Sequence, residues 1–398
     1  MTSKAKRPTV FFTAFEPSGD DLGAAVAAEL RRRDPDIRIC ALGADRLRAA
    51  GAEIIEDTGH EAVMGIPGPG VIAAHLRQLK RVDRWMREHN PVLHVAVDSP
   101  AANFPICKIS RRLGVPVCHL AAPQLWAWAP WRIRKLRRLT DKVLCLLPFE
   151  PEWFSSRGVP ATFIGHPVFD QPLDADAVAR RTEPFQQGKP NLALLPGSRP
   201  KEHFRNFPLM LETFRRLRAD RPDLAGRIAA VSADGERRLR SIADANGGWP
   251  DGLAVTVGDT EAVIAWADAC LTVSGTVSLH IMRQARPMVI MFKASRIAYE
   301  LLGRWLIYAE HLALPNLLAG KRIVPELMPY FGDHERLLRE ATALLDAPEA
   351  MARQREDLAQ VRSLFDGMDA AAGGADAILE LLGRAATPAD PAPTAAGA

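Results

Sequence analysis

Two strand-to-helix turns of similar design constrain the fold of this 398-residue chain more than any other feature. An apolar run ending at Leu195 leads into Pro196-Gly197-Ser198-Arg199, and another ending at Val273 leads into Ser274-Gly275-Thr276. A helix-like segment follows each turn, and parallel α/β domains use such turns to present backbone N–H groups to phosphates. The planar guanidinium of Arg199 also fits phosphate oxygens. Either turn alone could be an ordinary connection with a surface arginine, whereas the two together favour a site that holds a diphosphate.

The same alternation of short apolar runs and helix-like segments extends over most of the chain. The runs are rich in Val, Leu, Ala and Ile, which is typical of parallel strands buried on both faces. The predicted strands are 9–15, 37–42, 93–98, 115–120, 142–147 and 162–164 in the first half, and 191–195, 228–233, 253–257, 270–273 and 288–292 in the second. This pattern predicts an α/β protein with two doubly wound, Rossmann-like domains and a cleft between them.

Changes in composition divide the chain into five segments. The polar, proline-bearing stretch after residue 170 has no apolar periodicity, which is typical of a linker. Only Ala, Thr, Pro, Asp and Gly follow Arg384, so the end of the chain is expected to be disordered. The predicted segments are an N-terminal Rossmann-like domain at 1–170, a linker at 171–190, a C-terminal Rossmann-like domain at 191–345, C-terminal helices at 346–384 and a disordered tail at 385–398.

Composition and motifs exclude several other classes of protein. The five cysteines lie mostly in apolar runs without a C-x-x-C pair, which indicates buried thiols in a reducing compartment rather than disulfides or a zinc site. No secretory signal is visible, and the longest uncharged stretch, 115–131, is interrupted by three prolines, so a cytoplasmic protein is expected. The motifs of dinucleotide-binding proteins, P-loop proteins and serine hydrolases are absent, and no metal or other cofactor is expected. A net charge of only +4 argues against a nucleic-acid partner.

Asp98 is the candidate for a general base. It ends the apolar run 93–98 and precedes Ser99-Pro100, which puts its carboxylate at the carboxyl edge of the predicted sheet, where open α/β folds bind ligands. A carboxylate in a partly dry site can accept a proton from an attacking hydroxyl. Taken by itself, Asp98 could equally cap the helix that follows.

Two segments suggest a surface that meets lipid or another anion. The apolar stretch 62–72 leads into 73–87, where Leu and Trp side chains alternate with cations at helical spacing. Such a helix lies in a bilayer interface or, as the more common alternative, packs on a sheet with a solvated basic face. The second segment, 126–131, contains three tryptophans and precedes five cations, a composition that suits nucleobase stacking or a lipid headgroup layer.

Taken together, these residues resemble the lipid-A-disaccharide synthase family, whose members are inverting glycosyltransferases of the GT-B architecture. The resemblance runs from about residue 9 to 382 and keeps the family's blocks in order. These blocks are Glu16-Pro17-Ser18-Gly19-Asp20, Val63-Met64-Gly65-Ile66, Asp98-Ser99-Pro100, Trp126-Ala127-Trp128, Leu147-Pro148-Phe149-Glu150, Phe163-Ile164-Gly165-His166, Leu195-Pro196-Gly197-Ser198-Arg199, Ser274-Gly275-Thr276 and Pro315-Asn316-Leu317-Leu318-Ala319-Gly320.

The resemblance implies transfer of 2,3-diacylglucosamine from UDP to the 6-hydroxyl of 2,3-diacylglucosamine 1-phosphate, without a metal. It implies that Asp98 is the base, and that UDP is bound by Ser198, Arg199, Ser274, Gly275, Thr276, His280 and Asn316. The resemblance further implies that the acceptor side of the site contains Glu16, Ser18, Gly19, Arg132 and Arg134. It also implies that the cytoplasmic face of the inner membrane is contacted by Ile66, Val71, Leu76, Arg77, Lys80, Arg81 and Arg84. The protein would bind the membrane peripherally, either as a monomer or as a homodimer.

Three positions depart from the family pattern. Phe15 stands where the family has Gly, and Ala101-Ala102-Asn103 replace the region of a second Asp. His280 stands where the family has a Glu that commonly binds ribose hydroxyls, and a neutral imidazole accepts one hydroxyl proton where a carboxylate accepts two. A catalytically silent paralogue that binds a nucleotide sugar or an anionic glycolipid, as a sensor or partner, is therefore the alternative. The joint presence of Asp98 and Arg199 favours the enzyme.

Overall fold

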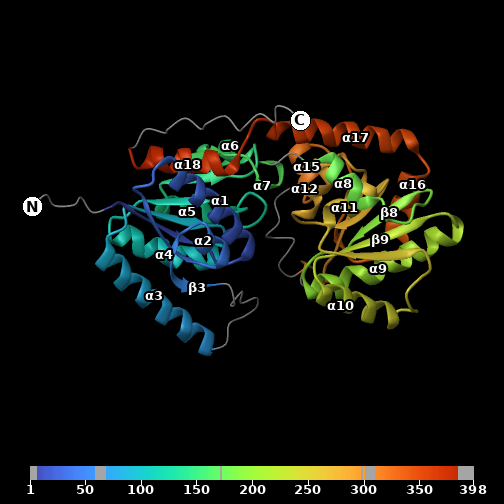
Figure 1. The fold of residues 1–398 in the computed structure, drawn as a ribbon, viewed down its shortest axis with the longest axis horizontal. Coiled ribbons are helices and arrows are strands. Elements are labelled where there is room, and N and C mark those ends of the chain that lie inside the picture. Colours follow the sequence, from blue (N-terminus) through green and yellow to red (C-terminus); the bar gives the residue numbers. More distant parts are fainter. Residues whose placement is uncertain (1–6, 59–68, 171–172, 297–298, 301–309, 384–398) are drawn as a thin grey trace, which may run out of the picture. The chain divides into compact units, whose positions relative to one another are not determined.

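The computed structural model describes residues 7–58, 69–170, 173–296, 299–300 and 310–383. The chain forms two compact units, one made of Met1–Asp170 and Gly367–Ala398 and the other of Gln171–Asp366. In each unit helices cover a parallel β-sheet (Figure 1), so the predicted α/β class with two Rossmann-like halves is confirmed.

The first unit contains a seven-stranded sheet in the order β3-β2-β1-β4-β5-β6-β7. Its strands are β1 (Thr9–Thr13), β2 (Arg38–Gly43), β3 (Glu53–Asp57), β4 (Leu93–Val97), β5 (Val117–Leu120), β6 (Lys142–Cys145) and β7 (Ala161–Phe163). The strand order reverses between β1 and β4, which pair in parallel. The connections after β1 and β4 therefore diverge to opposite faces of the sheet. The carboxyl ends of these two strands form a topological switch point.

Helices on both faces bury this sheet. One face carries α1 (Pro17–Arg33), α2 (Asp45–Ala49) and α18 (Ala370–Leu381), and the other carries α3 (Pro69–His89), α4 (Pro100–Arg112) and α5 (Ile133–Leu139). The remaining helices of the first unit are α6 (Glu150–Ser155) and α7 (Pro167–Asp170), with a 3-10 turn at Pro130–Arg132. Because side chains alternate along a strand, Val10 and Phe12 join the cluster beneath α1 and α18, whereas Phe11 joins the cluster beneath α3 and α4.

The last helix of the described chain, α18, belongs to the first unit, and Figure 1 shows it lying over α1. Two glycines allow the close approach, since a Cβ at Gly374 would lie 2.8 Å from Val26 and one at Gly373 would lie 3.1 Å from Ile164. The Asp369 side chain accepts a hydrogen bond from the Ala372 amide at 2.8 Å and caps the helix. The expected C-terminal helices at 346–384 are thus divided between the two units, with α17 (Pro348–Arg362) in the second.

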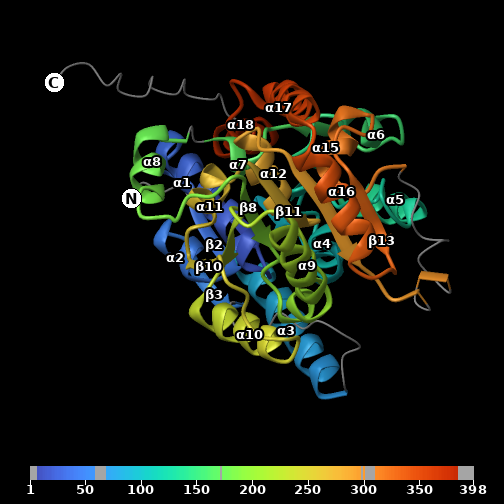
Figure 2. The ribbon, with the colours of Figure 1, turned by 90° about the vertical axis from the view of Figure 1, so that its right-hand side faces the viewer.

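The second unit contains a six-stranded parallel sheet in the order β10-β9-β8-β11-β12-β13. Its strands are β8 (Asn191–Leu195), β9 (Ala225–Ala230), β10 (Leu253–Val257), β11 (Ala269–Val273), β12 (Met288–Lys293) and β13 (Glu326–Tyr330). The helices α9 (Pro200–Asp220), α10 (Ala233–Asp244) and α16 (Glu335–Leu345) lie on one side, and α8 (Ala175–Thr182), α11 (Thr260–Trp266), α12 (Val277–Arg283), α15 (Leu314–Ala319) and α17 on the other (Figures 1 and 2). Here the strand order reverses between β8 and β11, the strands that lead into the turns Pro196–Arg199 and Ser274–Thr276.

The segment expected to be a linker, 171–190, contains the helix α8, which lies against α11 within the second unit. Asp174 caps α8 by accepting a hydrogen bond from the Ala177 amide at 2.8 Å. Val178 is its one buried residue, and one large apolar side chain in eight residues leaves no helical periodicity to read in the sequence.

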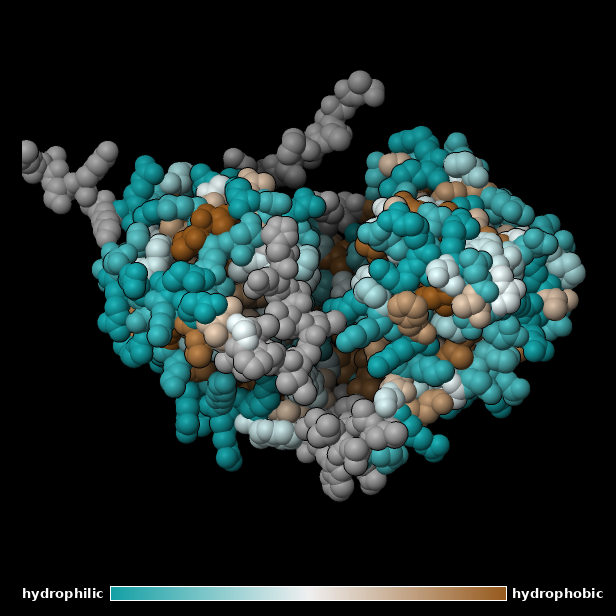
Figure 3. Space-filling view, turned by 90° about the horizontal axis from the view of Figure 1, so that it is seen from below, coloured by the Kyte–Doolittle hydropathy of each residue, from teal (hydrophilic) through white to brown (hydrophobic). Residues whose placement is uncertain are grey.

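Polar residues cover most of the visible surface of each unit (Figure 3), and the cysteines lie in the interior. The described residues visible in Figure 3 present a mainly hydrophilic surface in each unit, with hydrophobic residues scattered over it. All five cysteines are buried with free thiols, as the sequence predicts. Among the described residues, no helix has the length and apolar composition that crossing a membrane would require.

The packing of α18 gives a test of the fold. Leu379 is 1% exposed in the core of the first unit, so Leu379→Ala should lower its free energy of unfolding by about 2–5 kcal/mol. Leu76 of α3 is 54% exposed, and Leu76→Ala should change that free energy by no more than about 0.5 kcal/mol. Urea titration of both variants measures the difference, and equal effects would contradict the docking of α18 in this core.

Candidate functional site

In the first unit, the chain leaves β4 through an unusual turn at Asp98 and Ser99. Their φ angles are 46° and 35°, in the left-handed region, which costs a residue other than glycine about 1–3 kcal/mol. The Asp98 amide still donates to the carbonyl of Leu120 at 2.8 Å, so the turn begins at the end of the strand ladder. The N-cap residue of α4 is Ser99 rather than Asp98, which argues against the alternative that Asp98 caps the helix. The turn instead directs the chain away from the sheet at the switch point between β1 and β4.

The Asp98 carboxyl is a stronger base than an ordinary aspartate. Burial raises its pKa most, the neighbouring charge of Glu16 raises it further, and a hydrogen bond from the Ser99 backbone opposes both, so that the pKa lies above its usual value. A higher pKa strengthens a carboxylate as a proton acceptor. Asp98 therefore combines the position and the basicity that its predicted role needs.

The predicted acceptor-side residues after β1 lie beside this turn. Glu16 has an extended backbone immediately before α1, and its Oε1 accepts a hydrogen bond from the Ser99 hydroxyl at 3.0 Å. Ser18 is exposed in the first turn of α1, and Gly19 is buried there, where a Cβ would be 3.7 Å from Val97. The structure thus brings Glu16, Ser18 and Gly19 to the same edge of the sheet as Asp98.

The two other acceptor-side candidates follow β5, the strand next to β4. The Arg132 guanidinium lies 4.9 Å from the ring centre of Trp128, a cation–π contact, while Arg134 is exposed in α5. Trp128 and Trp131 are 46% and 54% exposed, so the aromatic and basic character predicted for this segment is at the surface. No direct contact joins Arg132 or Arg134 to Asp98 among the described residues.

The buried carboxyl of Glu150 fixes the start of this aromatic segment. The indole N–H of Trp126 donates to its Oε1 at 2.9 Å, and the Leu147 amide donates to its Oε2 at 3.1 Å. Burial raises the pKa of Glu150 to about 7, partly offset by these two bonds. Trp126 is therefore a structural anchor, in contrast to the exposed Trp128 and Trp131.

Most of the large apolar side chains of the amphipathic segment 73–87 pack inside the protein. Val82 is buried in α3, and Leu79 and Trp85 pack against the same cluster with Phe11. Leu76, Arg77, Lys80 and Arg84 remain exposed on the helix, and Arg81 is exposed but paired with Glu56 at 2.7 Å. Ile66 lies outside the described residues, as does the side chain of Val71. The alternative of a domain helix packed on the sheet thus holds for the C-terminal half of α3.

In the second unit, the two predicted phosphate-binding turns leave the neighbouring strands β8 and β11 at the same edge of the sheet. Gly197 has a φ of 100°, and a Cβ there would be 2.3 Å from the Glu202 carboxylate, so the position requires glycine. Ser274 is half-buried and Gly275 and Thr276 are exposed after β11. The structure therefore brings together the two turns that the sequence predicts.

An internal carboxylate occupies the first of these turns. Glu202 Oε2 accepts hydrogen bonds from the backbone amides of Ser198 and Arg199 at 3.1 and 3.2 Å, and Oε1 accepts one from Arg199 Nη1 at 3.1 Å. From beneath, the His203 Nε2–H donates to the Gly197 carbonyl at 2.9 Å, and burial lowers the pKa of this histidine and keeps it neutral. The Ser198 and Arg199 amides are thus engaged within the loop, and the exposed group that it presents is the Arg199 guanidinium, 58% exposed.

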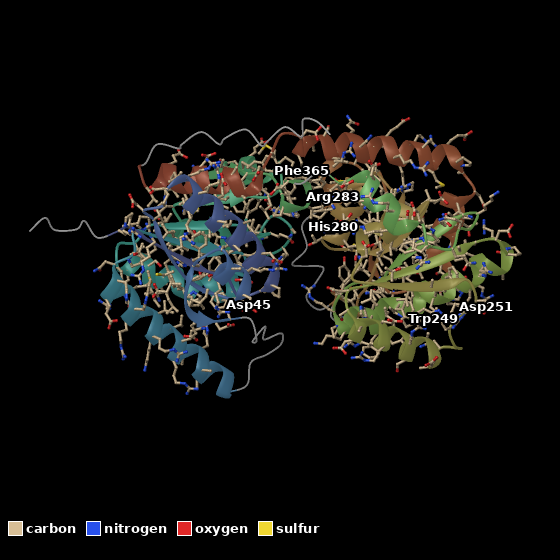
Figure 4. The ribbon with its side chains drawn as sticks, in the orientation of Figure 1. Asp45, Trp249, Asp251, His280, Arg283 and Phe365 are labelled. Carbon is tan, nitrogen blue, oxygen red and sulfur yellow. The ribbon has the colours of Figure 1, made fainter. Side chains whose placement is uncertain are left out.

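His280 lies one turn after Thr276 on α12 and forms a polar cluster with α11. Its Nδ1 contacts Glu261 Oε1, the same oxygen accepts from Arg283 Nη2 at 2.7 Å, and Gln284 donates to Glu261 Oε2 at 2.6 Å. Figure 4 shows His280 and Arg283 close together along α12. Burial by itself would raise the pKa of Glu261, but the bonds from His280 and Arg283 outweigh it and lower the pKa. A carboxylate is thus present beside the position where the family has its own Glu.

Asn316, expected to face the nucleotide, is instead bonded entirely within the second unit. It is fully buried in α15, and its Oδ1 accepts hydrogen bonds from the amides of Ile323 and Val324 at 2.8 and 2.9 Å. Its Nδ2 donates to the Val324 carbonyl at 3.0 Å and to Glu326 at 2.9 Å. Both donors and both acceptor positions of the amide are occupied, so Asn316 ties α15 to the start of β13 and has no capacity left for a ligand.

Sequence reasoning missed two of the carboxylates in these clusters. Glu202 could have been found, because Glu three residues after the residue that precedes a helix forms a capping box. Glu261 has no such signal, since its partners lie 19 to 23 residues further along the chain and only the packing of α11 against α12 brings them together.

Solved structures of other proteins share this fold. The co-structure of S. aureus MnaA with UDP has a TM-score of 0.64 at 12% sequence identity, and the alignment covers 97% of this chain and all of that one. The UDP-GlcNAc 2-epimerase of Neisseria meningitidis, bound to UDP-GlcNAc, has a TM-score of 0.61 at 12% identity and covers 94% of this chain and 98% of that one. At such low identity the similarity establishes the architecture alone.

Sequence comparisons identify the family. Lipid-A-disaccharide synthases of Myxococcus xanthus and Pseudomonas aeruginosa are 34% and 33% identical to this chain over 378 and 387 residues, covering 94% of it in both cases and 98% of each relative. That of Geobacter sulfurreducens is 32% identical over 383 residues, covering 94% of this chain and 97% of the relative. The family model described as lipid-A-disaccharide synthetase matches residues 10–367. By this match and these relatives, the chain belongs to the lipid-A-disaccharide synthetase family.

Proposed function

We propose that this protein transfers 2,3-diacylglucosamine from UDP-2,3-diacylglucosamine to 2,3-diacylglucosamine 1-phosphate, forming the β-1,6-linked lipid A disaccharide and releasing UDP. The observation that carries the proposal is the Asp98 carboxyl, whose pKa is raised, at a strand end where the backbone turns with positive φ angles, in a chain of this family. Burying the Asp98 carboxylate at a strand end costs stability, and its use as a base accounts for that cost. No feature of the described residues favours the alternative of a catalytically silent protein.

In the proposed reaction, the 6-hydroxyl oxygen of the acceptor attacks the anomeric carbon of the donor sugar. Asp98 takes the hydroxyl proton as the new carbon–oxygen bond forms. The bond from the anomeric carbon to the UDP oxygen breaks on the opposite face, so the configuration inverts. Arg199 and the turn Ser274–Thr276 stabilise the charge of the departing diphosphate. Ser198 contributes through the loop that Glu202 holds in place rather than through its engaged amide.

On the nucleotide side, we assign His280 to a ribose hydroxyl. Glu261 accepts the Nδ1–H, which leaves the lone pair of Nε2 to accept a hydrogen bond from the ribose. The role proposed for Asn316 is indirect, through the position of α15. Glu16, Ser18 and Gly19 would bound the acceptor site beside Asp98, and Arg132 and Arg134 are the candidates for the acceptor phosphate.

Substitution of the base tests the reaction. Asp98→Asn should reduce kcat by about 100- to 10,000-fold because the amide cannot accept the proton. UDP affinity should stay unchanged, since no group of the diphosphate site is altered. The melting temperature should be equal or higher at pH 7.5, because the substitution removes a desolvated charge. Turnover by product mass, calorimetric titration of UDP and thermal melting measure the three quantities.

Arg199→Ala is the contrasting variant. It removes a charge that contacts both the donor and the departing diphosphate, so UDP affinity and kcat should fall together. Near-normal turnover of Asp98→Asn would place the base elsewhere, and unchanged UDP affinity of Arg199→Ala would place the diphosphate elsewhere.

Ribose recognition can be tested with UDP and its 2′,3′-dideoxy analogue. The wild type should prefer UDP by about 2- to 10-fold, the effect of one or two neutral hydrogen bonds. His280→Ala should abolish the preference, and Glu261→Gln should reduce it, because the amide no longer fixes the Nδ1–H form of the ring. His334→Ala, at another half-buried histidine of the same unit, is the matched control and should keep it. A full preference in His280→Ala would remove this residue from the ribose site.

The proposed location is the cytoplasmic face of the inner membrane, where acylated substrates reside. The support is the exposed face of α3, with Leu76 beside Arg77, Lys80 and Arg84. A basic helix face with an apolar neighbour binds an anionic bilayer surface reversibly. Ile66, Val71 and Arg81 complete the proposed contact. The proposal requires no nucleic acid, and it holds for a monomer or a homodimer.

Vesicle sedimentation tests this contact. The protein should sediment with vesicles containing anionic lipid, and high salt should release it, because the attraction is electrostatic. Simultaneous reversal of Arg77, Lys80 and Arg84 to Glu should weaken the sedimentation. Reversal of Arg336, Arg339 and Arg353, exposed cations of α16 and α17, changes the net charge equally and should have little effect. Equal losses in both triple variants would show that net charge alone drives the binding.

A further inference from the structure

Four fully buried polar side chains form a continuous chain of hydrogen bonds beneath Asp98. Thr13 ends β1, His94 lies on β4, and Asn103 and Ser110 lie on α4, each with no exposed surface. The Ser110 hydroxyl is 2.8 Å from His94 Nδ1, and His94 Nε2 is 2.8 Å from the Thr13 hydroxyl. The Thr13 hydroxyl is in turn 2.5 Å from Asn103 Oδ1. A buried chain of this kind is stable only when every donor faces an acceptor.

The direction of the hydrogen bonds follows from the Asn103 end. Asn103 Nδ2 donates to the carbonyls of Val97 and Asp98 at 2.9 and 2.8 Å, which can only accept. Asn103 Oδ1 must then accept from the Thr13 hydroxyl, and Thr13 accepts from the Nε2–H of His94. Burial lowers the pKa of His94 to about 3, so the ring is neutral and its Nδ1 accepts from the Ser110 hydroxyl. The network therefore has a single direction, from Ser110 to the backbone on both sides of Asp98.

The two carbonyls that Asn103 binds belong to the peptide planes before and after the Asp98 Cα. Holding both planes against one amide group fixes φ and ψ of Asp98, and with them the direction of its side chain. This residue and Ser99 have positive φ angles of 46° and 35°, which persist only where surrounding contacts determine them. Asn103 stands in the region where the family has a second Asp.

We propose that Asn103 is a positioning residue for Asp98, and that Thr13, His94 and Ser110 hold the Asn103 amide in the orientation that aims the base at the acceptor hydroxyl. The inference rests on the proposed function, in which Asp98 is the base. Its geometry is independent of the ligand, because every bond in the network lies within the described residues of the first unit.

Substitutions at Thr13 test the network with little change in shape. Thr13→Val keeps the volume but removes the hydroxyl that joins His94 to Asn103, and kcat should fall by about 10- to 100-fold. KM for both substrates and UDP affinity should stay within about twofold, since no ligand contact is removed. Thr13→Ser restores the hydroxyl and should recover most of kcat. Thr140→Val is the matched control, because Thr140 is also buried in this unit and its hydroxyl has no partner among the described residues.

The pH profile supplies a readout that a purely structural role would not move. The acid limb of kcat reports the protonation of Asp98, whose pKa burial and Glu16 hold above its usual value. The buried His94 and His119 beneath it stay neutral, because burial lowers the pKa of each to about 3 and about 4. Release of the turn in Thr13→Val should hydrate Asp98, lower its pKa and move the acid limb to lower pH.

Asn103→Ala provides the second variant and should repeat the loss of kcat and the shift of the acid limb more strongly. The proposal is overturned if both variants melt earlier but keep the wild-type kcat and acid limb, or if Thr13→Ser behaves as Thr13→Val. It is also overturned, together with the catalytic role of Asp98, if Asp98→Asn retains near-normal turnover. If Asp98→Asn loses its activity while Thr13→Val keeps the wild-type kcat, the positioning role of Asn103 is overturned and the catalytic role of Asp98 is not.

Discussion

The burial of both sheets on two faces is the constraint on which the polar chemistry of this protein depends. Helices cover each face, so the candidate site residues that end the central strands lie at the strand ends, and the two reversals of strand order separate the connecting helices there. Asp98 and Glu16 follow β4 and β1, while Arg199 and Ser274 follow β8 and β11. Topology thus places the proposed general base at one switch point and the proposed diphosphate-binding turns at the other.

Internal carboxylates hold the functional loops in place at these edges. Glu202 binds the loop that presents Arg199, Glu261 binds His280, and Glu150 binds the indole of Trp126. Each carboxylate accepts two or more hydrogen bonds, so a single side chain orders groups from separate turns or helices. Loops ordered in this way lose less entropy when a ligand binds, which is the physical advantage of preorganisation.

The sequence predicts the central strands well because they are continuously apolar, and it predicts the two turns because glycine and small residues mark them. It does not predict the edge strands β3 and β13, whose residues are partly exposed and whose apolar pattern is correspondingly weak. Asp98 and Arg199 can be found from local context alone. The full engagement of Asn316, the pairing of Glu261 with His280 and the network through Asn103 depend on contacts between separate segments, and no local pattern records them.

The raised pKa of Asp98 ties the chemistry to the stability of the fold. A carboxyl whose pKa is higher in the folded than in the unfolded state stabilises the fold only while it is protonated, below its ordinary pKa of about 3.9. That contribution is lost as the pH rises through the folded-state pKa, which is the range in which the carboxylate becomes able to accept a proton. Above that pKa the first unit carries both a desolvated charge and two residues with positive φ at one strand end. The buried network through Asn103 offsets this cost locally, because it satisfies the backbone of the same turn whose side chain is left desolvated.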